Sequence, residues 1–171
     1  MNLKKILRME CMKMSVKRVL ILSGTPASGK SYWAKNKILP NIAYISRDEV
    51  RFSMLSDEDD YFAKEDAVFK EFIRRINEAI DNPEINAVIV DATHLNWASR
   101  NKTLRNLHLS KVDEVVPVIF NTPLNVCLDR NNKRKGRARV PDAVIRRMFY
   151  QRTDPHTDPF AYADFVEVNT K

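Results

Sequence analysis

Residues 18–31 read RVLILSGTPASGKS and contain the strongest structural signal in the chain. Its first six residues are nearly all apolar, which is typical of a β-strand buried on both faces. The next eight residues, from Gly24 to Ser31, match the pattern G-x-x-x-x-G-K-[ST] at every position. Helical spacing follows from Lys30 to Ile38, so the stretch predicts a strand, a tight loop and a helix in direct succession.

The loop between this strand and helix has the composition of a phosphate-binding loop. The chain contains only three glycines, and two of them, Gly24 and Gly29, lie in it. They let consecutive backbone N–H groups turn inward around phosphate oxygens, and the following helix adds its positive N-terminal end. Lys30 is expected to reach the β- and γ-phosphates as a catalytic cation, and the Ser31 hydroxyl is expected to be a ligand of Mg²⁺. The predicted site for ATP or another nucleoside triphosphate comprises Gly24, Thr25, Pro26, Ala27, Ser28, Gly29, Lys30, Ser31 and Tyr32.

Further β-branched runs and helical segments alternate along the rest of the chain. The runs occupy residues 42–46, 87–92, 115–121 and 164–169. The main helical segments occupy residues 61–80, 97–109, 124–133 and 142–151. Because strands alternate with helices, we expect an α/β protein: a single P-loop NTPase domain whose mostly parallel, five-stranded sheet is flanked by helices.

Length and composition exclude several classes of protein. With 171 residues and 44% hydrophobic content, the chain is long enough for one domain with a core and too short for two. No apolar run approaches the roughly 18 residues that a membrane span needs, and the first residues lack the apolar centre of a secretory signal. Cys11 and Cys127 make neither a disulfide framework nor a zinc site. We expect a cytoplasmic protein with a flexible basic extension at 1–16, a folded domain at 17–171 and no obligate protein partner.

The third predicted strand ends in an acidic residue. Asp91 closes the run AVIVD, so its carboxylate is expected at the carboxyl end of a buried strand. In that position it can hold Mg²⁺ directly or through water. The alternative is an aspartate that only caps the next turn. His94 lies at the same edge, and we assign it no role, because a lone histidine is more often a hydrogen-bonded structural residue.

The segment after the second predicted strand contains the residues that point to a reaction. Ser46 and Glu49 form a capping-box pattern, which predicts a helix beginning just past this strand. Asp48 then lies in the first turn, and Arg51 lies one turn later on the same face. At the carboxyl edge of a parallel sheet, such an Asp can accept the proton of an attacking hydroxyl while the Arg binds an anionic group. The alternative is a surface ion pair. The acidic string at 56–60 is expected to cap a second helix.

The net charge of +7 is unevenly distributed along the chain. Between Arg130 and Arg152 nine basic residues stand against one acid, whereas residues 47–71 contain nine acids and four bases. A basic block of this kind is often a solvated face, but this one lies where a helical lid over a triphosphate is expected, at 130–141. Arg130 and Arg134 are four residues apart and share a helix face, so they can neutralise charge on a transferring phosphoryl group.

Taken together, these motifs resemble the P-loop kinase module of polynucleotide 5′-kinases, as found in the bacteriophage end-healing kinase/phosphatase and in bacterial RNA-repair proteins. The shared motifs are GTPASGKS, SRDEVR, VDATHLN and VIFNTPLNVCLDRNNKR. The resemblance implies that Lys30 and Ser31 hold phosphates and Mg²⁺. His94 departs from the family pattern, which has asparagine at this position.

The resemblance also implies roles for the acceptor side and the lid. Asp48 would be the general base on a 5′-hydroxyl, and Arg51 would bind the 3′ phosphate of the acceptor. Arg130 and Arg134 would clamp the phosphates of the donor, with Arg134 as the catalytic contact in the transition state.

Three functional hypotheses follow. The leading one is in-line, Mg²⁺-assisted transfer of the γ-phosphate of ATP to the 5′-hydroxyl of a polynucleotide, which the basic lid favours. The first alternative is a small-molecule kinase acting on a sugar, a nucleotide sugar or an antibiotic. The acidic segment favours this alternative, because it would repel a long polyanion. The second alternative is an ATP-binding regulatory or RNA-binding module without transferase activity.

Overall fold

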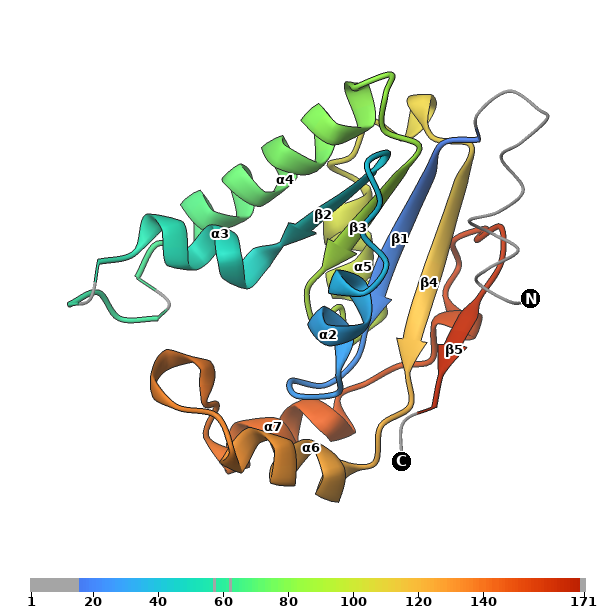
Figure 1. Ribbon diagram of the computed structural model, residues 1–171. Helices are drawn as coiled ribbons and strands as arrows, with labels where there is room; N and C mark the ends of the chain where they lie inside the picture. The colour runs from blue at the N-terminus through green and yellow to red at the C-terminus, as the bar shows by residue number, and fades with distance from the viewer. Residues whose placement is uncertain (1–15, 57, 62, 170–171) are drawn as a thin grey trace.

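A single parallel sheet forms the centre of the molecule (Figure 1). The structure, a computed structural model, describes residues 16–56, 58–61 and 63–169, so the extension predicted at 1–16 lies almost wholly outside the described residues. Within them the sheet has five strands in the order β2-β3-β1-β4-β5, and every neighbouring pair is parallel. The strands are β1 (Arg18–Ser23), β2 (Ile42–Ser46), β3 (Ala87–Asp91), β4 (Glu114–Phe120) and β5 (Val166–Val168). The predicted α/β fold and single domain architecture with a parallel sheet are confirmed, with all strands parallel rather than most.

Helices connect successive strands and cover both faces of the sheet (Figure 1). The α-helices are α2 (Lys30–Lys35), α3 (Arg47–Met54), α4 (Glu65–Asp81), α5 (Trp97–Leu104), α6 (Leu124–Asn132) and α7 (Asp142–Tyr150). The short 3₁₀ turns are η2 (Leu109–Lys111), η3 (Gly136–Ala138) and η4 (Pro155–Thr157). Among the described residues, no helix is both long and apolar enough to cross a membrane.

The core consists of two apolar layers, one on each face of the sheet. On one face, Phe72 and Ile76 of α4 pack with Leu104 of α5 against β1 and β3. On the other face, Ala34 of α2 packs against β1, β3 and β4, with Trp33 at its margin. Every residue of β1 and β3 is buried, which explains why these two runs lack the polar alternation of a half-exposed strand.

The carboxyl ends of the strands define one edge of the molecule, where the predicted site residues gather. Ser46 pairs with Asp91 in the β2–β3 register, so α3 begins beside the end of β3. The 24–31 loop leaves β1 at the same edge, and Figure 1 shows α6 and α7 lying beyond it. Parallel topology therefore brings distant segments of the sequence to one place.

Several predicted boundaries differ from the structure. The helix predicted over 30–38 ends at Lys35, and the helix predicted over 97–109 ends at Leu104. The last strand covers 166–168 rather than 164–169. The acidic string at 56–60 does not cap a helix, because α4 begins only at Glu65.

Within this string, Asp59 instead stabilises a turn. The Asp59 carboxylate accepts hydrogen bonds from the Ser56 N–H at 2.9 Å and from Lys64 Nζ at 3.0 Å. An aspartate that satisfies a backbone donor locally offers the chain a turn in place of a helix. The predicted cap on α3 is present, since Ser46 Oγ accepts from the Glu49 N–H at 3.3 Å.

A buried ion pair fixes the segment that follows α7. Arg100 and Asp158 are joined by two hydrogen bonds of 2.5 and 2.6 Å, and both side chains are at most 1% exposed. Arg100 also donates to the carbonyl of His94 and to Thr153 Oγ1. The chain between α7 and β5 is thereby tied to α5 and to the loop that follows β3.

Candidate active site

The predicted phosphate-binding loop, residues 24–31, has the backbone geometry that its glycines allow. Gly29 adopts the left-handed conformation, with φ 99°, which side chains disfavour. A Cβ atom at Gly24 would lie 2.8 Å from Ser28 Oγ and 2.9 Å from Phe120 Cβ. One glycine is therefore required by its backbone angle and the other by close packing under the loop.

Lys30 is folded back onto this loop. Its side chain is buried, and Nζ donates to the carbonyls of Gly24 at 2.8 Å and Thr25 at 2.9 Å. Burial lowers the pKa of Lys30 from its ordinary value, while the charges of Asp91 and Asp48 act in the opposite direction. The ammonium group thus lies within electrostatic reach of both predicted carboxylates, and it is held by neutral acceptors that a phosphate can replace.

Ser31 and Asp91 meet at the end of β3. Ser31 Oγ donates to Asp91 Oδ2 at 2.6 Å, and the Tyr44 hydroxyl donates to the same oxygen at 2.7 Å. Burial, followed by the Asp91 charge, raises the pKa of Tyr44 above its ordinary value of 10, so its phenol stays a donor. A hydroxyl and a carboxylate side by side are hard oxygen ligands of the kind Mg²⁺ takes beside phosphates, so the residues present fit this ion.

A network of charged and polar groups surrounds Arg51 on α3. The buried Arg51 guanidinium donates to Asp48 Oδ1 at 3.0 Å and to the Tyr61 hydroxyl at 2.7 Å. It also donates to Glu65 Oε2 at 2.5 Å, and Glu65 pairs in addition with Arg47. The Asp48 side chain remains 66% exposed. The predicted pair Asp48 and Arg51 is therefore present, but Arg51 has internal partners in Tyr61 and Glu65 that the sequence pattern did not indicate.

The two predicted lid arginines, Arg130 and Arg134, donate hydrogen bonds to different parts of the molecule. Arg130 Nη1 on α6 donates to the carbonyl of Ser28 at 3.4 Å, so this guanidinium meets the phosphate-binding loop. Arg134 donates to the carbonyl of Ala138 at 3.3 Å within the lid itself. The charge of Arg134 nevertheless contributes to the lowered pKa of Lys30, after burial, so this guanidinium lies within electrostatic reach of that lysine.

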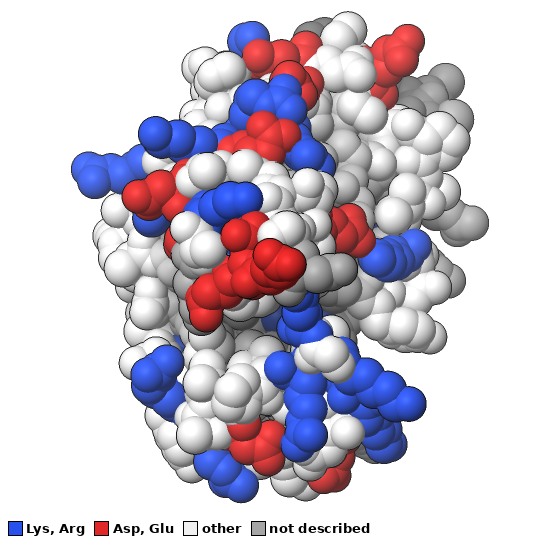
Figure 2. Space-filling view, turned by 90° about the vertical axis from the view of Figure 1, so that its left-hand side faces the viewer, with Lys and Arg blue, Asp and Glu red and all other residues white. Residues whose placement is uncertain are grey.

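The lid reaches the opposite side of the site. Arg137 of η3 donates to the carbonyl of Ser56 at 2.5 Å, which joins the lid to the loop after α3. Figure 2 shows this face of the molecule, with a band of acidic side chains across its middle and basic side chains below the band. The segment around α3 and the lid thus differ in charge, as the distribution along the sequence predicted.

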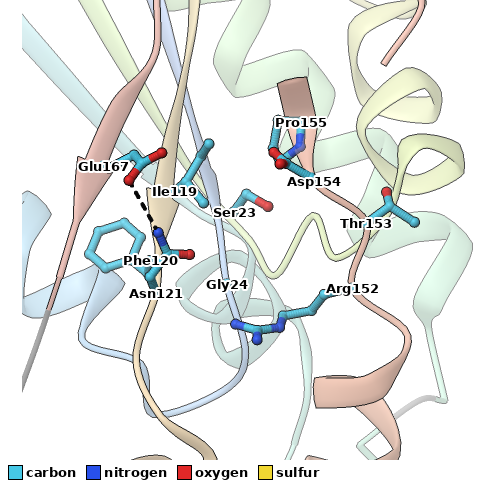
Figure 3. A pocket seen from close by; sticks show the side chains of 10 residues that line it. All are labelled: Ser23, Gly24, Ile119, Phe120, Asn121, Arg152, Thr153, Asp154, Pro155 and Glu167. Carbon is cyan, nitrogen blue, oxygen red and sulfur yellow. Dashed lines mark hydrogen bonds between the residues drawn. The ribbon is translucent and has the colours of Figure 1, made fainter. Parts of the chain in front are cut away.

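A pocket of about 250 Å³ lies behind the start of the loop (Figure 3). It is lined by Ser23, Gly24, Ile119, Phe120, Asn121, Arg152, Thr153, Asp154, Pro155 and Glu167. The Arg152 guanidinium lies 3.9 Å from the centre of the Phe149 ring, and its Nε donates to the Phe149 carbonyl at 3.1 Å. The sequence indicates Arg152 only as part of the basic block, because no local pattern places this residue in one pocket with Gly24.

His94 has a structural place in the same region. Its ring is buried, with Nδ1 2.9 Å from the carbonyl oxygen of Leu22 and Nε2 3.1 Å from Thr103 Oγ1. Its backbone φ is 39°, in the left-handed region that asparagine tolerates better than most residues. Burial lowers the pKa of His94 to about 3, so the ring is neutral at physiological pH.

The fold and the site together define a nucleotide-binding P-loop protein. A family model described as an AAA domain (AAA_33) matches residues 19–155, so the chain belongs to that family of P-loop kinases. The predicted resemblance to a P-loop kinase module is thereby confirmed. The roles of the individual site residues stay predictions.

Solved structures share the fold. A chain of the Pnkp1/Rnl/Hen1 RNA repair complex matches with a TM-score of 0.68 and 23% identity, over 83% of this chain and 46% of that chain. A fungal RNA kinase matches with a TM-score of 0.61 and 11% identity, over 92% and 76%. A sugar kinase from Janibacter sp. HTCC2649 matches with a TM-score of 0.54 and 15% identity, over 90% and 85%. The present chain thus spans less than half of the RNA repair chain.

Proposed function

We propose that this protein transfers the γ-phosphate of ATP to the 5′-hydroxyl of a polynucleotide. The observation that carries the proposal is the placement of Asp48. Its exposed carboxylate lies on the first turn of α3, close enough to Lys30 for the two charges to interact. A carboxylate within electrostatic reach of the cation of a phosphate-binding loop suits in-line phosphoryl transfer to a hydroxyl, because it can take the hydroxyl proton during the transfer.

The reaction uses the chain's own groups in a definite order. The backbone N–H groups of the 24–31 loop and Lys30 bind the donor phosphates, after the lysine leaves its two carbonyl acceptors. Asp48 takes the proton of the acceptor hydroxyl, whose oxygen attacks the γ-phosphorus while the bond to the leaving ADP breaks. Arg130 and Arg134 offset the charge that spreads over the phosphoryl oxygens.

Mg²⁺ completes this assignment as a proposed cofactor. Ser31 and Asp91 would hold it, and when bound it supplies charge neutralisation for the phosphates. Tyr44 keeps the Asp91 carboxylate in place by donating to Oδ2.

Two further facts support a polynucleotide as the acceptor. The lid presents Lys133, Lys135 and Arg139 to solvent, which suits a phosphate backbone. Two of the fold relatives are an RNA repair complex and a fungal RNA kinase.

A small hydroxylated molecule is the second candidate acceptor. The acidic band on the acceptor side in Figure 2 is the specific observation that favours it, because these charges repel a long polyanion. The hydrogen bonds of Arg51 also favour a small acceptor, because a guanidinium bonded to Glu65 is less available to the phosphate of a polynucleotide. A sugar kinase is among the fold relatives.

The deciding experiment uses γ-labelled ATP, Mg²⁺ and a short oligonucleotide that has a 5′-hydroxyl. We expect label on the 5′ end, and none on the same oligonucleotide carrying a 5′-phosphate. Asp48→Asn is the matched variant, because it keeps the shape of the side chain and removes its basicity. It should lower transfer by about 10²-fold or more while ATP binding stays nearly unchanged.

Other outcomes are equally informative. Bound ATP with no labelled oligonucleotide would contradict a polynucleotide acceptor and direct the same assay to sugars, nucleotide sugars and antibiotics. A flat dependence of oligonucleotide binding on salt would argue the same way, because phosphate contacts give a steep dependence. If Asp48→Asn abolished ATP binding as well, its role would be structural or metal-binding.

A further inference from the structure

The carboxylate of Asp48 is held by one of its two oxygens. Oδ1 accepts from Arg51 Nη1 at 3.0 Å and from the Tyr61 hydroxyl at 2.8 Å. Within the part of the chain that the structure describes, no hydrogen bond to Oδ2 is found, and the side chain is 66% exposed. One oxygen of the carboxylate is thus anchored, and the other has no hydrogen-bond partner among the described residues.

The two anchors come from different segments of the chain. Arg51 lies one turn further along α3, so its contact with Asp48 follows from the helix itself. Tyr61 lies in the loop between α3 and α4 and reaches the same oxygen from outside the helix. A single contact leaves a carboxylate free to rotate about its last bond, whereas a second contact from another direction restricts that rotation.

Tyr61 is itself fixed in the orientation that makes it a donor. Its ring centre lies 4.3 Å from the Arg51 guanidinium, and its hydroxyl accepts from Arg51 Nη1 at 2.7 Å. Because the oxygen accepts from Arg51, the single hydroxyl proton is directed toward Asp48. Burial, followed by the Asp48 charge, raises the pKa of Tyr61 above its ordinary value of 10, which keeps this proton in place at neutral pH.

We infer that Tyr61 is a positioning residue that orients Asp48 so that Oδ2 is the atom that accepts the proton of the acceptor hydroxyl. This inference rests on the proposed function. In the step it describes, the O–H bond of the acceptor breaks and its proton passes to Asp48 Oδ2. The acceptor oxygen forms the new bond to the γ-phosphorus, and the bond from phosphorus to ADP breaks. Tyr61 touches neither reactant.

The test begins with Tyr61→Phe in the full chain, assayed with γ-labelled ATP and the 5′-hydroxyl oligonucleotide. We expect kcat to fall about 10-fold, because the base is misaligned, while KM for ATP and for the oligonucleotide changes by less than about twofold. The matched control is Tyr150→Phe, since Tyr150, at the end of α7, is 78% exposed and its ring contacts Phe149 rather than the groups around Asp48. A merely structural loss would change KM and thermal stability together with kcat.

A second measurement tests the contact without using activity. With ¹³Cζ-labelled tyrosine, the NMR signal of Tyr61, assigned by its absence in Tyr61→Phe, is followed with rising pH. Asp48→Asn should move the ionisation of the Tyr61 phenol to lower pH, because it removes the negative charge of the carboxylate that accepts from this hydroxyl.

Each result decides a different point. Tyr61→Phe with the kcat of the wild type overturns the inference and leaves the proposed function standing. An unmoved Tyr61 signal in Asp48→Asn overturns it as well, because the contact is then absent. Failure of the wild type to label any hydroxyl acceptor overturns the proposed function and the inference with it. A selective loss of kcat together with the shifted signal supports both.

Discussion

Ser31 Oγ lies 2.6 Å from Asp91 Oδ2, although the two residues are 60 positions apart in the chain. The contact joins the first turn of α2 to the end of β3. It exists because β1 and β3 are neighbouring parallel strands, so their carboxyl ends lie side by side. Under the proposed function, these two side chains would together hold Mg²⁺, so the contact would join the phosphate-binding loop to the proposed metal site.

Replacing Asp91 by asparagine tests that link. The amide keeps the size of the side chain but loses its charge, so we expect Asp91→Asn to raise the Mg²⁺ concentration for half-maximal transfer by about 10-fold or more. Binding of a fluorescent ATP analogue without Mg²⁺ should change little. Tyr44→Phe is the comparison variant: it removes a donor to the same oxygen but leaves the carboxylate, so its Mg²⁺ dependence should change less than that of Asp91→Asn. An unchanged Mg²⁺ dependence in Asp91→Asn would show that Asp91 only caps the loop.

Removal of the Lys30 ammonium group should abolish transfer. In Lys30→Ala the donor phosphates lose their main cation, and we expect a fall in kcat of about 10²-fold or more. The fold should persist, because the two hydrogen bonds that Lys30 Nζ donates go to carbonyls of the loop itself. Circular dichroism and thermal unfolding check the fold, and the labelled-ATP assay checks transfer. Activity near that of the wild type would contradict the assignment of this loop.

Gly24 and Gly136 are required for different reasons. Alanine substitutions at the two positions distinguish close packing from backbone strain. Gly24→Ala places a Cβ against Ser28 Oγ and Phe120 Cβ at under 3 Å, so we expect a loss of about 1–3 kcal/mol in unfolding free energy and impaired ATP binding. Gly136→Ala is the matched control, because Gly136 has a φ of 55° but nothing within 4 Å of its Cβ position. Its cost is local strain in the lid, and ATP binding should survive. Urea unfolding and nucleotide titration measure both quantities.

Much of the fold was accessible from the sequence because it rests on local patterns. The strand before Gly24, the helix cap at Ser46 and the order of strands and helices follow from short-range chemistry that the structure preserves. The ends of the helices were harder to predict from the sequence. Asn36 ends α2 early by bonding to the carbonyl of Tyr32, and Pro40 follows.

The parts of the site that the sequence could not supply depend on long-range contacts. Glu65 and Tyr61 lie 14 and 10 residues from Arg51, and no spacing rule connects a loop residue or the start of another helix to α3. The same holds for Arg100 and Asp158, whose buried pair spans 58 residues. Such contacts depend on how helices and loops pack against one another. The sequence therefore shows which residues are charged but does not predict which of them are neighbours in the fold.

His94 is the position that departs from the family pattern, and its burial leads us to predict that the free energy of unfolding depends on pH. Burial lowers the pKa of its imidazole to about 3 in the folded state, against an ordinary value of 6.5. Between these values the unfolded chain binds a proton that the folded chain does not, so stability falls as the pH drops from about 6.5 toward 3. The full contribution is present above pH 6.5, and on the order of a few kcal/mol is lost by pH 3.

Asparagine at this position should remove that dependence. It does not titrate, it tolerates the left-handed backbone at φ 39°, and its amide can still bond to the Leu22 carbonyl. We expect the unfolding free energy of His94→Asn, from urea titrations between pH 4 and 7, to vary less steeply with pH than that of the wild type. Thr103→Val is the control, because it removes the partner of Nε2 but keeps the buried imidazole, so its stability should fall by a similar amount at every pH. Equal slopes in wild type and His94→Asn would mean that the imidazole is charged or solvated in the folded protein.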